Sequence, residues 1–447
     1  MMERIAEKKE KIALFTCMPP VRSGIVAYSK LLIENLSDFY EIDIYCGTPP
    51  LQKAKNTFHH TQFLFRHLKL PYEAIIYQLG NHESFSFVYP YLAHYPGITV
   101  LHDIVLYQSR AKYLINSGKY KEYEEEMQYC HGYSGKKMAQ VSLQYPMPGY
   151  SAFLFTMNKL VIEKSLVIGV HTKYFQEQLQ FEYPAKKIFQ VPMSLDMPAV
   201  EDLKRKVRER YTISDKTLLI GSAGFVDQHK GIESIIEVMN SVQKKYNVHF
   251  IWLGEDRNNM IQKSIEKIAN PEVREKLKKM FTVTGYLQEE DFLSYLRELD
   301  IFINLRYPTA GEFSGVLWLA LQSGKATVMS DLPHLYEIPE ECVLRIKLTK
   351  ETESLEEALL SLLEYKDQRE QLGRRAKEYV SQNFTIAKMV NTYRYMIDEV
   401  KKVPRVTISD ALLPRHWQSF TLSGLLASLS LEQPESWKNI LEHLDLG

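Results

Sequence analysis

Residues 304–316, with the sequence NLRYPTAGEFSGV, combine residue types that bind phosphate and hydroxyl groups. Arg306 offers a planar guanidinium, which can bind a phosphate through two parallel hydrogen bonds. Glu312 can accept hydrogen bonds from the hydroxyl groups of a sugar. Charged residues around a turn of small residues are costly if they only fill a loop. The segment therefore predicts a site for an anionic, hydroxyl-bearing ligand.

The end of the same segment predicts a helix N-terminus that faces an anion. An apolar helix pattern covers residues 317–322, and Gly324 is expected to end it. The backbone N–H groups of Ser314, Gly315 and Val316 would precede or begin this helix. Such N–H groups, together with the helix dipole, favour a phosphate.

A second candidate is Lys230, in the segment 224–231 (GFVDQHKG) that follows an apolar strand pattern. A helix pattern begins directly after it, so the ammonium and the helix N-terminus could together neutralise a diphosphate. A solvated surface lysine beside a glycine is an equally good interpretation of this segment alone.

A third candidate is Gly24, in the loop 19–25 (PPVRSGI) between the first strand pattern and a helix pattern. Glycine allows the backbone to approach a phosphate closely, and ligands of open α/β sheets bind at the carboxyl ends of strands. On this segment alone, an ordinary strand-to-helix loop is the favoured interpretation.

The pair His102 and Asp103 closes the fourth strand pattern. An imidazole can donate to or accept from a sugar hydroxyl, and its ordinary pKa lies near neutrality. A structural cap is an equally good interpretation of His102. His171 is expected to be structural, or to support the site at most.

Composition limits the classes of protein. The chain has 447 residues, which suits two domains, with 45% hydrophobic and 25% charged residues. Lys plus Arg equals Asp plus Glu at 55 each, so a dedicated nucleic-acid binder is not expected. Four scattered cysteines and the lack of a long apolar run predict a cytoplasmic protein without a membrane span. Contact with the inner face of a membrane is left open.

Short apolar runs alternate with helix patterns along the chain, which is typical of parallel α/β sheets. In the first half, strands are expected at residues 12–17, 40–45, 74–78, 98–101, 166–170 and 188–191. In the second half, they are expected at residues 218–224, 249–254, 281–284, 301–305, 326–330 and 343–346. A long polar helical stretch, roughly residues 106–164, interrupts the first series.

These patterns predict two doubly wound, Rossmann-like α/β domains. The expected bounds are 1–198 for the first domain and 199–384 for the second, with the charged stretch 201–210 as the linker. Residues 385–403 are expected to form an amphipathic helix, and residues 404–447 a helical extension. In this extension Trp417, Phe420, Leu425 and Leu426 need apolar cover.

Several segments of the sequence resemble those of the retaining family-4 glycosyltransferases, which have the two-domain GT-B fold. The resemblance extends to about residue 402. It is carried by the segments YQLGN at 77–81, LHD at 101–103, VHT at 170–172, VPM at 191–193, FTVTGY at 281–286 and RYPTAGEFSG at 306–315. The last matches a branch with the pattern R-Y-P-T-x-G-E-x-S-G.

The resemblance implies that residues 1–198 are the acceptor-side domain, that residues 199–384 are the nucleotide-sugar domain, and that the helix at 385–403 crosses onto the first domain. It also implies roles for single residues. His102 would contact the transferred sugar, and Gly24 would lie beside the diphosphate. Lys230 would neutralise the leaving group, with backbone donors from the Ser314 turn, and Gly285 and Tyr286 would bracket the base. No metal or other cofactor is expected, since the sequence has no Asp-x-Asp motif and no Cys or His cluster.

Two departures from the family pattern concern donor binding. Many relatives have two glutamates separated by seven residues in the donor loop, but here the second falls on Leu319 or, counted from Glu312, on Ala320. Many relatives also have arginine where this chain has Phe225. Arg306 is a candidate replacement for that arginine.

The resemblance therefore implies transfer of a sugar from a UDP- or GDP-linked donor to a hydroxyl of a glycan, lipid-linked or protein acceptor. Retention of configuration is expected. Two alternatives stay open, a nucleotide-sugar epimerase of the same fold and a non-catalytic partner protein. Peripheral membrane contact through the first domain is a further alternative, because residues 109–137 mix tyrosines with lysines and Arg110. Glutamates at 122 and 124–126 interrupt this charge, so a plain solvated helical face is the favoured interpretation.

Overall fold

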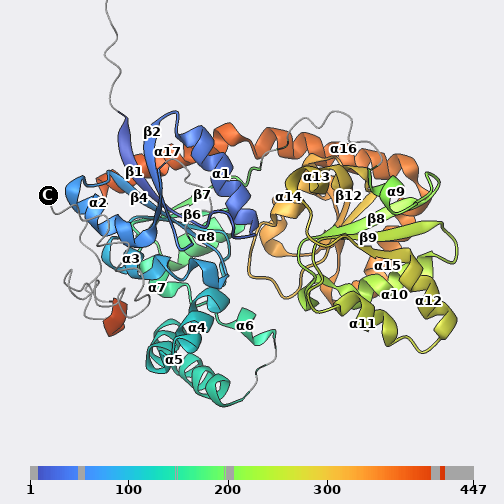
Figure 1. Ribbon diagram of the computed structural model, residues 1–447, viewed down its shortest axis with the longest axis horizontal. Coiled ribbons are helices and arrows are strands. Elements are labelled where there is room, and N and C mark those ends of the chain that lie inside the picture. The colour runs from blue at the N-terminus through green and yellow to red at the C-terminus, as the bar shows by residue number, and fades with distance from the viewer. Residues whose placement is uncertain are drawn as a thin grey trace, which may run out of the picture. The chain divides into compact units, whose positions relative to one another are not determined.

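A computed structural model describes residues 9–48, 56–145, 147, 149–195, 197, 206–403 and 413–417. These residues form two compact units (Figure 1). The first contains the described residues of Met1–Pro192, Ala310–Glu312 and Ile386–Gly447. The second contains those of Met193–Thr309 and Phe313–Thr385.

The first unit is built on a parallel sheet of seven strands in the order β3-β2-β1-β4-β5-β6-β7. The strands are β1 (Glu10–Phe15), β2 (Tyr40–Cys46), β3 (Thr57–His59), β4 (Ala74–Leu79), β5 (Ile98–Leu101), β6 (Val167–Val170) and β7 (Lys187–Gln190). All six residues of β4 are buried, as expected for a strand with helices on both faces of its sheet. The six expected strands are confirmed within two residues, whereas β3 is short and polar and was not predicted.

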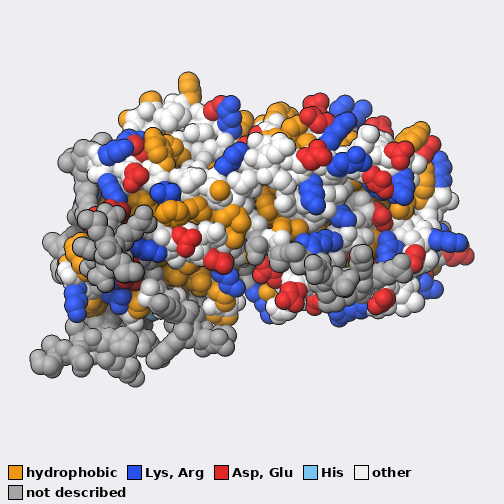
Figure 2. Space-filling view, turned by 90° about the horizontal axis from the view of Figure 1, so that it is seen from above, with side chains coloured by type: hydrophobic (Ala, Val, Ile, Leu, Met, Phe, Trp, Pro, Cys, Tyr) orange, Lys and Arg blue, Asp and Glu red, His pale blue; other side chains and the backbone are white. Residues whose placement is uncertain are grey.

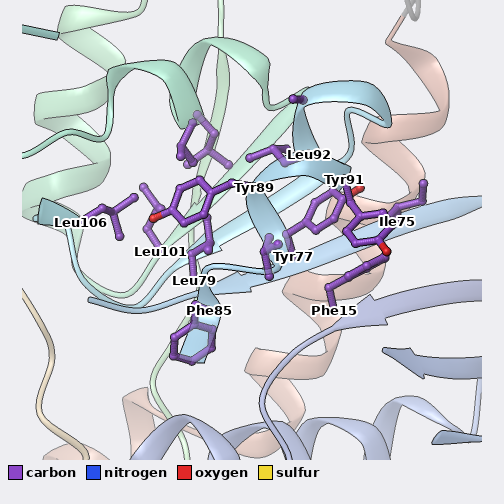
Figure 3. Packing of buried hydrophobic residues seen from close by; sticks show 14 of the residues in the cluster. Phe15, Ile75, Tyr77, Leu79, Phe85, Tyr89, Tyr91, Leu92, Leu101 and Leu106 are labelled. Carbon is purple, nitrogen blue, oxygen red and sulfur yellow. The ribbon is translucent and has the colours of Figure 1, made fainter. Parts of the chain in front are cut away.

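Aromatic rings fill much of the core of the first unit (Figure 3). Phe15 lies with its ring centroid 5.0 Å from that of Tyr77 and 4.9 Å from that of Tyr91. The rings are tilted against each other, which is a favourable geometry for aromatic pairs. These contacts tie β1 and β4 to α3 (Val88–His94), so the strands next to the candidate loops are held rigidly.

The remaining helices of the first unit include a terminal helix from the far end of the chain. They are α1 (Gly24–Leu36), α2 (Phe63–Lys69), α4 (Tyr107–Asn116), α5 (Tyr120–Gln144), α6 (Ser151–Leu154), α7 (Lys159–Lys164), α8 (Lys173–Glu182) and α17 (Ile386–Lys402). The amphipathic helix predicted at 385–402 is found as α17. It packs closely on the sheet, because a Cβ on Gly169 of β6 would lie 3.4 Å from the sulfur of Met396.

The helices α4, α5 and α6 form a helical lobe with a small apolar cluster of its own. Within α5 the chain reverses at Gly132, whose φ of 62° is the left-handed conformation that glycine adopts without strain. The two halves of α5 then pack against each other, and a Cβ on Gly135 would collide with the carbonyl oxygen of Met127. The long helical stretch expected at 106–164 is therefore four separate helices.

The second unit contains a parallel sheet in the order β10-β9-β8-β11-β12-β13. Its strands are β8 (Leu218–Ala223), β9 (Val248–Leu253), β10 (Phe281–Val283), β11 (Ile301–Asn304), β12 (Ala326–Ser330) and β13 (Leu344–Ile346). Its helices are α9 (Lys206–Arg210), α10 (Ile232–Val242), α11 (Met260–Glu266), α12 (Pro271–Met280), α13 (Glu289–Glu298), α14 (Gly315–Gln322), α15 (Glu351–Glu364) and α16 (Lys366–Asn383). All six expected strands are confirmed, and this strand order is that of a Rossmann fold.

On the face shown in Figure 2, Lys and Arg side chains are interspersed with Asp and Glu over the second unit. No described helix is long and apolar enough to cross a membrane. Of the expected C-terminal extension, only Leu413–Trp417 is described, with Leu413 and Trp417 buried. Phe420, Leu425 and Leu426 lie outside the described residues, as do residues 201–205 of the expected linker.

Candidate functional site

In the second unit, the strand order reverses between β8 and β11, and ligands of such sheets bind outside the carboxyl ends at this point. Lys230 lies in the loop after β8, is buried, and donates from Nζ to the carbonyl oxygen of Ala223 at 3.2 Å. Gly224 has a φ of +90°, and a Cβ there would lie 2.9 Å from the Lys230 ammonium. The glycine is therefore required for the lysine to reach the edge of the sheet.

Arg306 follows β11 and is held by the residues around it. Its backbone N–H donates to Ser330 Oγ at 2.8 Å, and its Nη2 donates to Ser314 Oγ at 2.9 Å. Ser314 is the N-cap of α14, with its hydroxyl also accepting from the backbone N–H of Leu317. The arginine is thus fixed beside the first turn of α14, where Gly315 and Val316 lie.

The loops that carry Lys230 and Arg306 are in contact. The backbone N–H of Tyr307 donates to the carbonyl oxygen of His229 at 2.8 Å. A Cβ on Gly231, whose φ is +62°, would lie 2.6 Å from Leu305 Cδ1. The structure therefore brings Lys230, Arg306 and the start of α14 to one edge of the sheet.

Gly285 and Tyr286 lie at the carboxyl end of the edge strand β10. Gly285 has a φ of +72° and open space where a Cβ would lie. Tyr286 is 45% exposed. Thr284 orders this turn, since its hydroxyl accepts from the backbone N–H of Gly254 at 3.1 Å and donates to the carbonyl oxygen of Gly285. A planar group could stack on this exposed tyrosine.

Phe225 stands where many relatives have arginine, and the guanidinium of Arg257 lies over its ring. The Cζ atom of Arg257 lies 4.2 Å from the ring centroid, and Arg257 also pairs with Glu255 at 2.9 Å. The sequence analysis considered only Arg306 as a replacement. Arg257 is a second cation beside Gly224, and no pattern in the sequence pointed to it.

Glu312 belongs to the first unit, together with Ala310 and Gly311, whereas Arg306 belongs to the second. Its Oε2 accepts from the backbone N–H of Ala310 at 3.0 Å. The two positions for a second glutamate differ in burial, with Leu319 partly buried against an apolar cluster and Ala320 fully buried. Neither provides a carboxylate.

In the first unit, Gly24 begins α1 after the N-cap Ser23, and no atom lies within 4 Å of where its Cβ would be. Asp103 has a local partner, since its Oδ2 accepts from the backbone N–H of Asn81 at 2.7 Å. Asn81 in turn accepts from the first-turn N–H groups of α4 at 2.8 and 3.2 Å. Asp103 therefore orders the loop that caps the helical lobe.

His102 and His171 form a buried hydrogen-bonded chain. His171 Nδ1 lies 2.9 Å from the carbonyl oxygen of Val191, and His171 Nε2 lies 2.9 Å from His102 Nδ1. His102 Nε2 lies 2.5 Å from the amide of Gln78, which contacts the Tyr393 hydroxyl at 2.7 Å. Burial lowers the pKa of His102 well below its usual range, and burial also lowers the pKa of His171, to about 4. Both imidazoles therefore have a pKa below the ordinary value near neutrality.

When both imidazole rings are neutral, these hydrogen bonds have one consistent arrangement of donors and acceptors. A carbonyl oxygen only accepts, so His171 carries its proton on Nδ1 and accepts at Nε2. His102 must then donate from Nδ1 and accept at Nε2. Gln78 Oε1 is placed against His102 Nε2 and Gln78 Nε2 against the Tyr393 hydroxyl, so this order requires the oxygen and nitrogen of the amide to be exchanged. The Gln78 oxygen then accepts from Tyr393, and Tyr393 accepts from the Tyr28 hydroxyl at 3.1 Å. Both nitrogens of His102 are thus used inside the first unit.

Sequence reasoning missed Gln78 and Tyr393 as members of this chain. Gln78 had a signal, since it is a polar residue within the otherwise apolar strand β4. Tyr393 had none, because 315 residues separate it from its partner and only the fold brings them together.

The Tyr393→Phe variant is expected to lose about 1–3 kcal/mol of unfolding free energy, since it leaves the buried Gln78 oxygen and the Tyr28 hydroxyl without their partner. Urea unfolding measures the loss. Tyr395→Phe is the matched control, because Tyr395 is on the same helix and 53% exposed. Equal effects of the two substitutions would contradict the hydrogen-bonded chain.

No group of three or more His, Cys, Asp or Glu in the described parts of the chain is placed to hold a metal ion. In the second unit, the groups that converge are an ammonium, a guanidinium and the N–H groups of a helix start. Such groups bind phosphate oxygens.

Known proteins share this fold. Residues 216–365 match the family model described as Glycosyl transferases group 1. An uncharacterized glycosyltransferase of Methanocaldococcus jannaschii is 23% identical over 257 residues, which are 55% of this chain and 61% of that protein. The match therefore spans about three fifths of the relative's length.

Solved structures match over most of the chain at low identity. Sucrose-phosphate synthase from Thermosynechococcus elongatus has a TM-score of 0.60 at 14% identity, over 89% of this chain and 100% of that one. HepE of Anabaena, in complex with UDP-glucose, has a TM-score of 0.56 at 14% identity, over 87% and 99%. A candidate UDP-N-acetylglucosamine 2-epimerase from Listeria monocytogenes has a TM-score of 0.53 at 12% identity, over 90% and 99%. The chain thus has the GT-B fold of two Rossmann-like units, and its residues 216–365 are similar to the group 1 glycosyl transferases.

Proposed function

We propose that the protein transfers a sugar from a UDP- or GDP-linked donor to an acceptor hydroxyl. The observation that carries this proposal is the position of Arg306, 2.9 Å from the N-cap hydroxyl of α14. A guanidinium beside the N–H groups of a helix start can bind phosphate oxygens together with those groups. Lys230, on the adjoining loop, adds a second cation at the same edge of the sheet. A diphosphate fits this arrangement.

In this proposal the second unit holds the donor and stabilises its leaving group. Lys230, Arg306 and the N–H groups of Ser314, Gly315 and Val316 bind the diphosphate, whose charge grows as the bond to the sugar breaks. Gly285 and Tyr286 bracket the base, with the exposed ring of Tyr286 available for stacking. HepE of Anabaena, which has a similar fold, was solved in complex with UDP-glucose. Gly24 would offer its open backbone to the diphosphate.

The chemical step we propose keeps the configuration at the anomeric carbon. The leaving phosphate oxygen takes the proton of the acceptor hydroxyl, which attacks on the same face of the sugar. Glu312 would hold a sugar hydroxyl. His102 is assigned a positioning role, because both of its ring nitrogens already have partners inside the first unit. Together with Asp103 it orders the loops at the carboxyl edge of that sheet.

For the acceptor, the helical lobe is our candidate contact. Tyr133 and Tyr150 on the lobe are 72% and 60% exposed, and Lys136 and Lys137 lie next to Tyr133 in the sequence. Exposed aromatic and basic side chains suit both the sugar rings of a glycan and the headgroups of a membrane that carries a lipid-linked acceptor. Sedimentation with anionic vesicles separates these two acceptors.

The test is incubation of the protein with a panel of UDP- and GDP-sugars without added metal. We expect one donor to release free nucleoside diphosphate, with water as a slow acceptor, and the release to be lost in Lys230→Met. Conversion of the donor into an epimer, seen by NMR without transfer, would instead identify an epimerase. Neither release nor nucleotide binding in folded protein would favour the non-catalytic partner.

A further inference from the structure

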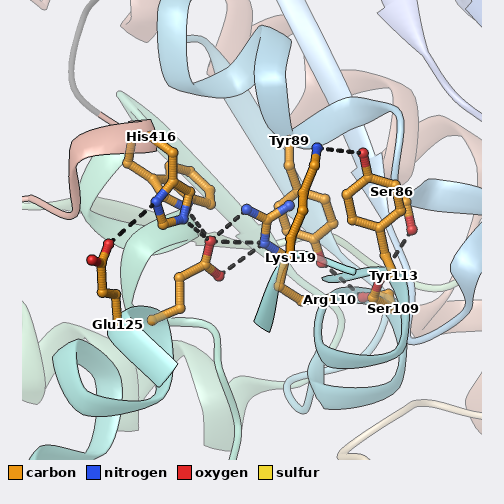
Figure 4. A network of polar contacts seen from close by, with 10 residues as sticks. Ser86, Tyr89, Ser109, Arg110, Tyr113, Lys119, Glu125 and His416 are labelled. Atoms are coloured by element: carbon orange, nitrogen blue, oxygen red, sulfur yellow. Dashed lines mark hydrogen bonds and ion pairs between the residues drawn. The ribbon is translucent and has the colours of Figure 1, made fainter. Parts of the chain in front are cut away.

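The segment Leu413–Trp417 packs in the first unit and contacts two carboxylates of the helical lobe, the buried Glu126 and, from His416 Nδ1 at 3.8 Å, the more exposed Glu125. Its short 3-10 helix places His416 Nε2 and Trp417 Nε1 each 2.6 Å from Glu126 Oε1 (Figure 4). Glu126 is in α5, about 290 residues earlier in the sequence. The sequence analysis gave this segment no role beyond the need for apolar cover.

The carboxylate of Glu126 is also the partner of a buried arginine. Arg110 of α4 donates to Glu126 from Nε and Nη2, and both residues are buried. The guanidinium lies between two rings, 4.6 Å from the centroid of Tyr89 and 5.3 Å from that of Trp417. A buried carboxylate is costly unless its oxygens are well supplied with donors. The segment provides two of the donors and covers the ion pair.

The same segment also packs against α3 and the main apolar core of the first unit. The Trp417 ring packs edge-on against Tyr89 of α3, with the centroids 6.1 Å apart. Leu413 and Trp417 both belong to the main apolar core of the unit, whereas the lobe has a separate cluster. Tyr129 and Cys130 of α5 also pack against that main core, so the segment adds a further attachment between the lobe and the rest of the unit.

We propose that residues 413–417 are a clip that fixes the helical lobe against the sheet, and that Glu126 is the group the clip holds. The clip fixes the position of α4, which begins four residues after Asp103. This helix is part of the lobe that the proposed function makes the contact for the acceptor. It does not depend on the donor residues, which belong to the second unit.

The test is hydrogen–deuterium exchange on the full chain with the variants His416→Ala and Trp417→Ala. We expect amide exchange in α4 and α5 to become at least about tenfold faster, equivalent to about 1.4 kcal/mol of local opening, while β1 and β4 keep their rates. Arg415→Ala is the matched control, because Arg415 is exposed on the same short helix. Trp417→Phe keeps the ring but loses the N–H donor, so its effect should be intermediate.

Two results would overturn the clip. One is unchanged exchange in α4 and α5 in both variants, which would mean that the contacts to Glu126 do not hold the lobe. The other is equal acceleration through the whole first unit, which would make Trp417 an ordinary core residue. Nucleotide binding measured on the same samples reports on the second unit alone, so failure of the proposed function would be seen separately.

Discussion

Replacing Lys230 by methionine is expected to weaken binding of the donor nucleotide by about 10–150-fold. A hydrogen bond to a charged group contributes about 1.5–3 kcal/mol, and the ammonium is the buried cation in the loop after β8. Methionine keeps the length and most of the volume of the lysine side chain, so packing beneath Gly224 should be preserved. Isothermal titration calorimetry with the nucleotide that binds wild-type protein measures the change.

The matched control for this prediction is Lys216→Met. Lys216 is exposed and lies just before β8, at the opposite end of the strand that leads to the Lys230 loop. The two variants lose the same charge from the same unit, but only one loses it at the carboxyl edge of the sheet. Equal weakening by both would show that the effect is one of net charge, and the assignment of Lys230 to the diphosphate would fail.

Replacing Glu126 by glutamine is expected to lower the free energy of unfolding by about 3–5 kcal/mol, the usual cost of removing one partner from a buried ion pair. The substitution leaves the guanidinium of Arg110 buried without a counter-charge. The double variant Glu126→Met with Arg110→Met should recover much of the loss, since neither charge is then buried. Glu122→Gln, a partly exposed position on the same helix, is the control in urea unfolding.

The same loss should depend on pH in a defined direction. Burial alone would raise the pKa of Glu126, but the neighbouring Arg110 and His416 lower it by more, so its pKa in the folded protein is about 2. The folded pKa is thus below the ordinary value of 4.5, so the carboxylate contributes stability above about pH 4.5 and loses it as the pH falls towards 2. The difference between wild type and Glu126→Gln should shrink over that range. A difference that stays constant down to pH 2 would contradict the ionised pair.

Much of the fold could be predicted from the sequence, because parallel strands buried on both faces are continuous apolar runs. All six strands of the second unit and six of the seven in the first were found in this way. The strand β3 was missed because it has only three residues, Thr57–His59, of which two are polar and all are only partly buried. The lobe was read as one helical stretch because the reversal depends on a single glycine, Gly132, within a helix-compatible sequence.

Site residues that directly follow a strand could be predicted from the sequence. Partners that only the fold brings together from distant parts of the chain could not. Lys230 and Arg306 each follow a strand, so their positions at one edge follow from the topology. The partners Gln78 and Tyr393 come from distant parts of the chain, and so do Glu126 and Trp417. Contacts of this kind leave no local pattern in the sequence. For this reason the sequence did not indicate that both ring nitrogens of His102 have partners.

The central claim is that the second unit binds the diphosphate of a nucleotide. The most direct test is thermal unfolding of the wild-type protein with UDP, GDP or ADP in the absence of metal. A ligand that binds only the folded state adds about 2.7 kcal/mol of stability at one hundred times its Kd. We predict a saturable rise of the melting temperature with one of the three nucleotides. No rise with any of them, in protein that unfolds cooperatively, would contradict the account.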